Sequence, residues 1–146
     1  MFRGQFEHTI DSKGRISVPS RFREVLKKYD DRLIITISDR CLVAYTNEEW
    51  AVLEQKLSTL PQMDKGVQDF YRHIYSNAMD CNIDKQGRLL IPQNLRDYAN
   101  LQKEVVLVGE MKKIEIWAKD RWDQESNNKL GEGIDQIRQT LAAMGI

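Results

Sequence analysis

The sequence contains few of the residues from which metal sites and redox sites are built. It has two cysteines, Cys41 and Cys81, which lie far apart in the chain without a C-x-x-C motif. Its two histidines, His8 and His73, have no further ligand at the spacing of a zinc site. We therefore expect no metal and no cofactor, and we expect both cysteines to be buried thiols in a reducing cytoplasm.

Long hydrophobic runs and catalytic motifs are also missing. No run approaches the ~18 apolar residues of a membrane-spanning helix, and the opening MFRGQFEHTID lacks the apolar core of a signal peptide. The chain has no G-x-S-x-G, H-E-x-x-H or P-loop motif, and its carboxylates are scattered. These absences argue against an enzyme and against a membrane protein, and we expect a cytoplasmic location.

The chain has no net charge, because 22 basic residues balance 22 acidic ones. This balance argues against a protein that binds nucleic acids through a generally basic surface. The charges are nevertheless segregated, since basic residues predominate in residues 1–28 and acidic residues in residues 120–146.

The sequence repeats itself. Ile10–Pro19 (IDSKGRISVP) returns as Ile83–Pro92 (IDKQGRLLIP), so that Asp, Gly, Arg and Pro recur at an offset of 73, and Arg23 recurs as Arg96. A second match, Tyr45–Trp50 with Trp117–Trp122, follows at an offset of 72. Two matches in the same order indicate that the chain is a duplication.

Each half has the same predicted order of elements. In the first half, alternating apolar residues from Phe2 to Ile10 predict a strand, and a tight turn and a short strand follow. Pro19, like Pro92 in the second half, is expected in the first turn of a short helix. A pair of strands at residues 33–37 and 41–45 precedes a helix that Thr46 caps. In the second half Met79, Cys81 and Ile83 are expected on the apolar face of the first strand.

The two halves are joined and followed by helical segments. Residues 58–66, with a proline and a glycine, are the predicted linker, and an amphipathic helix follows over residues 67–75. Gly131 and Gly133 are expected to interrupt the last helix, after which Ile134, Ile137, Leu141 and Met144 form an apolar stripe.

The fold predicted from this pattern is α+β. Because a half of ~70 residues makes a thin core alone, we expect two β-hairpin units interlocked into one small barrel, with pseudo-two-fold symmetry and helices outside. The segments are a first repeat (1–60), a connecting segment and helix (61–75), a second repeat (76–122) and a helical tail (123–146).

The most distinctive motif is D-x-x-G-R, which occurs at the tip of each predicted hairpin. We expect Asp11, Gly14, Asp84 and Gly87 to shape the two turns. The arginine that follows each turn then lies on the solvent side of its strand, where its guanidinium can donate two parallel hydrogen bonds to a guanine in the major groove. Alternatively, each arginine pairs with the aspartate of its own turn and only stabilises it, by ~0–1 kcal/mol. The two roles are compatible.

Five basic residues are therefore candidates for binding DNA. Two would contact bases, namely Arg15 and Arg88. Three would contact phosphates and set the register of the protein on the duplex, namely Lys13, Lys85 and Arg3. The second half has Ser76 where the repeat would place a partner for Arg3, and Gln86 where it would place one for Lys13.

The opening MFRGQFEHTIDSKGRISVPSRFRE, with CNIDKQGRLLIP and IEIWAKDRW later in the chain, closely resembles the MraZ family over about residues 1–122. The resemblance implies two fused halves of the AbrB-like swapped-hairpin fold. It implies a nucleoid-associated transcriptional repressor of its own division and cell-wall operon, which binds double-stranded DNA as a ring-like homo-oligomer, most simply an octamer. It also implies that Arg15 and Arg88 contact the DNA.

A ring has consequences for the DNA. Its subunits present their hairpins in the same sense, which predicts short direct repeats spaced by about one helical turn, ~10 bp. The alternative is a ring-forming protein-interaction or antitoxin-like module that does not bind DNA, with the apolar stripe of the tail as its binding surface.

Overall fold

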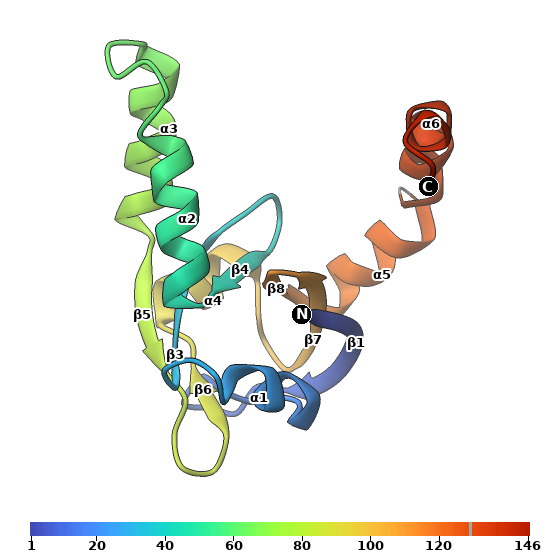
Figure 1. Ribbon diagram of the computed structural model, residues 1–146. Helices are drawn as coiled ribbons and strands as arrows, with labels where there is room; N and C mark the ends of the chain where they lie inside the picture. The colour runs from blue at the N-terminus through green and yellow to red at the C-terminus, as the bar shows by residue number, and fades with distance from the viewer. Residues whose placement is uncertain (129) are drawn as a thin grey trace.

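The computed structural model describes residues 1–128 and 130–146 (Figure 1). Within these residues the chain forms a six-stranded antiparallel sheet, a two-stranded ribbon and six helices. The strands are β1 (Phe2–Thr9), β2 (Arg15–Ser17), β3 (Arg32–Ile37), β4 (Leu42–Tyr45), β5 (Met79–Asn82), β6 (Arg88–Leu90), β7 (Glu104–Met111) and β8 (Lys113–Ala118). The helices are α1 (Ser20–Leu26), α2 (Asn47–Leu57), α3 (Lys65–Ser76), α4 (Gln93–Ala99), α5 (Lys119–Asn128) and α6 (Leu130–Ala143).

The two halves of the sequence share one sheet, whose strand order is β1-β7-β8-β4-β3-β5. The first strand of each half pairs with a strand of the other half. β1 runs along β7 from Phe2 opposite Met111 to Thr9 opposite Glu104, and β5 pairs with β3. β4 and β8 join the halves at the centre of the sheet. Neither half could therefore complete its hydrogen bonds alone.

The ribbon consists of β2 from the first half and β6 from the second. Arg15 lies opposite Leu90 and Ser17 opposite Arg88. Single bridges, Ile10 to Ile16 and Ile83 to Leu89, join the ribbon to the ends of β1 and β5. The ribbon thus spans between the two edge strands of the sheet.

The core lies between the sheet, the ribbon and the short helices. Ile16 and Leu89 turn inward from the ribbon and are fully buried, together with Phe22 of α1 and Leu95 of α4. The rings of Phe2 and Phe6 pack edge-on against Phe22, with centroids 5.5 and 5.1 Å apart. Pro19 and Pro92 occupy the positions just before α1 and α4, one residue earlier than the first helical turn that we expected.

Helices α2 and α3 form an arm that projects from one side of the strands (Figure 1). The hydroxyl of Thr46 accepts a hydrogen bond from the backbone N–H of Glu49 and caps α2, as the sequence predicts. Asp64 caps α3 in the same way, so that α3 begins at Lys65, before the predicted end of the linker. No residue of α3 is fully buried, and most of its side chains are exposed.

Helices α5 and α6 form the tail, on the other side of the molecule in Figure 1. α5 is held by an ion pair in which Arg40 Nη1 lies 2.9 Å from Glu125 Oε1. The prediction for the glycines of the tail is wrong, because Gly131 and Gly133 lie inside α6 rather than interrupting it. The apolar stripe of α6 is largely exposed, with Ile134 and Ile137 56% and 46% accessible.

The structure corrects the prediction for Met79 and confirms the prediction for the two cysteines. Met79 was expected on the apolar face of β5 with Cys81, but its side chain is 40% exposed, because it lies at the outer edge of the sheet where β5 begins. Cys41 and Cys81 are free and buried, as predicted. Burial raises the pKa of Cys41 to about 12 and that of Cys81 to about 11.

Candidate nucleic-acid interface

The D-x-x-G-R motif of the first half forms a closed turn between β1 and β2. Asp11 accepts hydrogen bonds at Oδ1 from the backbone N–H groups of Lys13 and Arg15, at 3.0 and 2.9 Å. Its other oxygen, Oδ2, lies 2.7 Å from Arg15 Nε. One carboxylate thus fixes both the turn and the direction of the arginine side chain.

The turn of the second half repeats these contacts. Asp84 Oδ1 accepts from the backbone N–H groups of Gln86 and Arg88, both at 2.9 Å, and Oδ2 lies 3.1 Å from Arg88 Nε. The backbone N–H of each arginine is the largest of the contacts that hold the pKa of Asp11 and of Asp84 below the ordinary value of an aspartate. Both aspartates are therefore ionised at neutral pH, and each stays paired with its arginine.

Each arginine uses Nε to contact its aspartate, and this leaves the two terminal nitrogens of the guanidinium for a ligand. Among the described residues, no acceptor for the Nη atoms of Arg15 or Arg88 is found. Both side chains are 30% exposed. Their strands alternate, so Arg15, Ser17, Arg88 and Leu90 form the outer face of the ribbon while Ile16 and Leu89 point into the core. We call these four outward residues the ribbon face.

The glycine of each turn is required by its conformation and by an arginine from the other half. Gly14 has φ +89°, and a Cβ there would lie 2.6 Å from Nε of Arg96 in α4. Gly87 has φ +77°, and a Cβ there would lie 2.7 Å from Nη1 of Arg23 in α1. Each turn is therefore covered by an arginine that belongs to the other repeat.

Backbone contacts tie the turns across the repeats as well. The N–H of Val18 donates to the carbonyl of Gly87 at 2.9 Å, and the N–H of Ile91 donates to the carbonyl of Gly14 at 2.8 Å. Arg96 Nε donates to the carbonyl of Ile91 at 2.9 Å. These contacts make the two turns and the ribbon one continuous unit, whose basic side chains come from both halves.

The structure brings four of the five basic candidates to this unit. Lys13 and Lys85 are exposed in the two turns, next to Arg15 and Arg88. Arg3 is exposed near the start of β1, opposite Glu110 of β7, and the rest of the strand separates it from the turn that follows. The structure therefore does not place Arg3 in either turn.

Sequence reasoning assigned no role to Arg23 and Arg96. A signal was available, because these arginines recur at the same offset as the motif itself. Their reach into the opposite turn could not be inferred, since it depends on the way the halves interlock.

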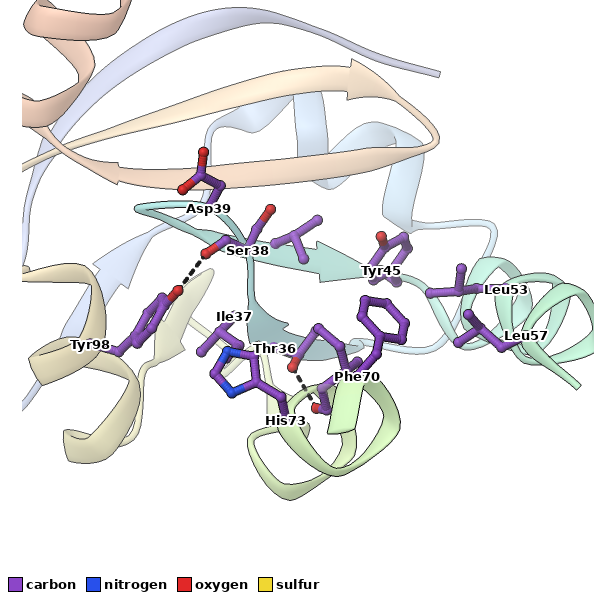
Figure 2. Close-up of a pocket in the computed structure, with 12 residues that line it drawn as sticks. Thr36, Ile37, Ser38, Asp39, Tyr45, Leu53, Leu57, Phe70, His73 and Tyr98 are labelled. Atoms are coloured by element: carbon purple, nitrogen blue, oxygen red, sulfur yellow. Dashed lines mark hydrogen bonds between the residues drawn. The ribbon is translucent and has the colours of Figure 1, made fainter. Parts of the chain in front are cut away.

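A separate groove of about 400 Å³ lies where the arm meets the sheet (Figure 2). Leu53 and Leu57 of α2 and Phe70 of α3 line its apolar side. At its far end the hydroxyl of Tyr98 donates to the carbonyl of Ser38 at 2.8 Å. The groove is mostly apolar and carries no basic cluster, so it differs in character from the ribbon face.

The described residues contain no group of three or more side chains suited to bind a metal ion. Nor does any of the described helices have the length and apolar character needed to cross a membrane.

Comparison with known proteins identifies the family. The family described as "MraZ protein, putative antitoxin-like" matches residues 1–72 and 74–142. The chain belongs to the MraZ family. A relative from Caldicellulosiruptor saccharolyticus named "Transcriptional regulator MraZ" is 45% identical over the full length of both chains. Relatives of the same name from Caldicellulosiruptor bescii and Desulforamulus reducens are 46% and 51% identical, the first over both full chains and the second over 85% of this chain and 86% of the relative.

The family membership confirms the resemblance carried by the two D-x-x-G-R motifs, and it extends through the tail, where the sequence alone offered no match. The solution structure of PHS018 from Pyrococcus horikoshii covers 80% of this chain and 88% of its own, with 16% identity and a TM-score of 0.36.

Proposed function

We propose that this protein is a DNA-binding transcriptional regulator that inserts its ribbon face into the major groove. The observation that carries the proposal is the duplicated turn, in which a carboxylate holds an arginine by Nε and leaves its terminal nitrogens directed outward. A two-stranded ribbon fits the major groove, and a guanidinium donates two hydrogen bonds to O6 and N7 of guanine. The family name of the relatives supports the same conclusion.

Within this proposal Arg15 and Arg88 contact bases, and Lys13 and Lys85 contact the flanking phosphates. Gly14 and Gly87, with Asp11 and Asp84, shape the turns. The pairing of each arginine with its aspartate reduces the entropy that the side chain loses on binding, so the turn-stabilising role and the DNA-binding role act together. Arg3 stays a prediction from the sequence.

We further propose that the fold is an AbrB-like swapped-hairpin barrel with pseudo-two-fold symmetry. Two observations support it: the exchange of strands between the halves, and the bridges that join the ribbon to both edge strands of the sheet. The division into repeats 1–60 and 76–122, with a connector 61–75 and a tail 123–146, belongs to the same proposal.

We propose that the protein binds short direct repeats of DNA as a ring-like homo-oligomer, with eight subunits as the expected number. The neutral chain supports this, because one subunit contacting a few phosphates would bind weakly, whereas several linked subunits raise the effective concentration of each later contact. The apolar groove of the arm and the exposed stripe of α6 offer surfaces for head-to-tail contact. The regulated gene cluster is its own division and cell-wall operon, which it represses in the nucleoid.

The test is a gel shift with the DNA upstream of its own gene, at two salt concentrations. Arg15→Ala should lose specific binding, at about 1–3 kcal/mol for each contact removed, while Lys13→Ala should weaken binding to all sequences and lower the salt slope by about 1. Arg72→Ala is the matched control, because Arg72 forms an exposed ion pair of the same kind with Asp69 on α3, away from the ribbon.

Two results would contradict the proposal. One is unchanged specific binding by Arg15→Ala. The other is a large fall in the melting temperature of this variant, because an exposed ion pair contributes only ~0–1 kcal/mol and the arginine would then be chiefly structural. If the wild-type protein prefers no DNA but sediments as a ring, it is a protein-interaction module.

A further inference from the structure

The ribbon face is nearly symmetric, but one position breaks the symmetry. Ser17 in β2 corresponds to Leu90 in β6 at the repeat offset of 73. Leu90 is 52% exposed, whereas its neighbour Leu89, which points inward, is 1% exposed. The second half thus presents an aliphatic side chain where the first presents a hydroxyl.

The exposed leucine does not serve to cover the arginine beside it. Leu90 lies directly opposite Arg15, and Ser17 lies directly opposite Arg88. If leucine shielded its cross-strand partner, Arg15 would be less accessible than Arg88, yet both side chains are 30% exposed. The accessible surface of Leu90 is therefore directed at whatever the ribbon face contacts.

Isolated exposed leucines are common on proteins and by themselves indicate nothing. The position of Leu90 is what distinguishes it, because the other three members of the ribbon face are Arg15, Ser17 and Arg88. An aliphatic group among hydrogen-bond donors suits a ligand that offers a methyl group next to polar acceptors. In the major groove of DNA this ligand is thymine, whose C5 methyl group lies beside O4.

We propose that Leu90 contacts the C5 methyl group of a thymine and thereby determines part of the sequence that the protein recognises. This inference rests on the proposed function of the ribbon face. Side chains directly opposite on paired strands have Cβ atoms about 4.5–5.5 Å apart, and successive base pairs are about 3.4 Å apart. Arg15 and Leu90 are thus spaced to contact a guanine and a thymine on base pairs that are neighbours or nearly so. Arg88 would bind a guanine in the same way, but Ser17 opposite it has no aliphatic side chain, so no thymine is required beside that guanine.

The experiment measures binding of the full-length protein to two versions of its own upstream DNA, one with thymine and one with every thymine replaced by uracil. Uracil keeps the hydrogen-bonding groups and lacks only the methyl group. Wild-type protein should bind the uracil duplex about fourfold more weakly per contacted thymine, which corresponds to the ~0.8 kcal/mol of one buried methyl group. Single uracil substitutions then locate the thymine.

Leu90→Ser should bind both duplexes with equal affinity, because the outward residues of β6 are then an arginine and a serine, as they are in β2. Leu90→Met keeps an apolar contact and should keep the preference for thymine. Leu60→Ser is the matched control, because Leu60 is also exposed (38%) and lies in the loop between α2 and α3, outside the ribbon and the groove. Its preference for thymine should equal that of the wild type.

The inference is overturned if Leu90→Ser binds DNA and retains the full preference for thymine. It is also overturned if Leu90→Ser changes the sedimentation of the free protein, because Leu90 would then lie in a contact between subunits. Failure of the proposed function gives a different result, in which the wild-type protein does not distinguish its upstream DNA from an unrelated duplex of equal length.

Discussion

Replacing Gly14 with alanine tests whether the turn and its covering arginine form one rigid unit. Gly14 has φ +89°, a conformation that costs an L-amino acid about 1–2 kcal/mol. The new Cβ would lie 2.6 Å from Arg96 Nε and 2.9 Å from the carbonyl oxygen of Ile91. Arg96 would have to move and would lose its hydrogen bond to that carbonyl, at a cost of about 1 kcal/mol.

The sum predicts a loss of about 2–3 kcal/mol in the free energy of unfolding, and a melting temperature lower by about 6–12 °C for a chain of this size. Thermal unfolding followed by circular dichroism measures it. Gly131→Ala is the control, because a Cβ at Gly131 in α6 would meet no atom within 4 Å apart from the local backbone of its own helix. Alanine there should therefore leave stability unchanged or raise it by up to ~1 kcal/mol. Equal melting temperatures for Gly14→Ala and the wild type would refute the reasoning.

The double variant Gly14→Ala with Arg96→Ala separates the two contributions. Without the guanidinium only the backbone strain and the contact with Ile91 remain, so the alanine at position 14 should cost less in this background than in the wild type. If its cost is the same in both backgrounds, Arg96 does not rest on the turn in solution.

Three further predictions concern titratable groups. Cys41 and Cys81, whose pKa values burial raises, should resist a thiol reagent at pH 8 in the native protein and react fully in denaturant; rapid native labelling would contradict this. Partial burial lowers the pKa of His8, so its protonation should destabilise the fold as the pH falls below ~6.5. Between pH 7.5 and 5 the melting temperature of His8→Gln should therefore fall less than that of the wild type. An equal fall in both proteins would exclude this role. The lowered pKa of Asp84 implies stabilisation that is present above its unfolded pKa, near 4, and lost as the pH falls further, so the stability advantage of the wild type over Asp84→Asn should disappear in acid; a constant difference would contradict it.

Local patterns were sufficient for most of the strands and helices. The alternation from Phe2 to Ile10, the apolar runs at residues 33–37 and 41–45, and the cap at Thr46 all correspond to elements of the structure. The errors lie where tertiary position overrides local pattern. Met79 fits an apolar face by its spacing, yet it lies exposed at the edge of the sheet.

In the candidate site, too, the local contacts could be predicted from the sequence and the contacts between the repeats could not. Each aspartate lies four residues before its arginine, and this spacing suffices to predict the turn and its ion pair, because both are made within five consecutive residues. The contacts of Arg23 with the turn of Gly87, and of Arg96 with the turn of Gly14, join residues of different repeats. No short sequence pattern predicts these contacts.

The sequence by itself determined the duplication, the two D-x-x-G-R turns and the family, because these depend on residue identity and short spacing. Only the tertiary structure decided that β2 and β6 pair, that the ribbon face combines Arg15 with Leu90, and that each turn rests under an arginine of the other half. The physical reason is that the backbone N–H and C=O groups along an unpaired strand edge need hydrogen-bond partners. In this chain strands of each half pair with strands of the other half.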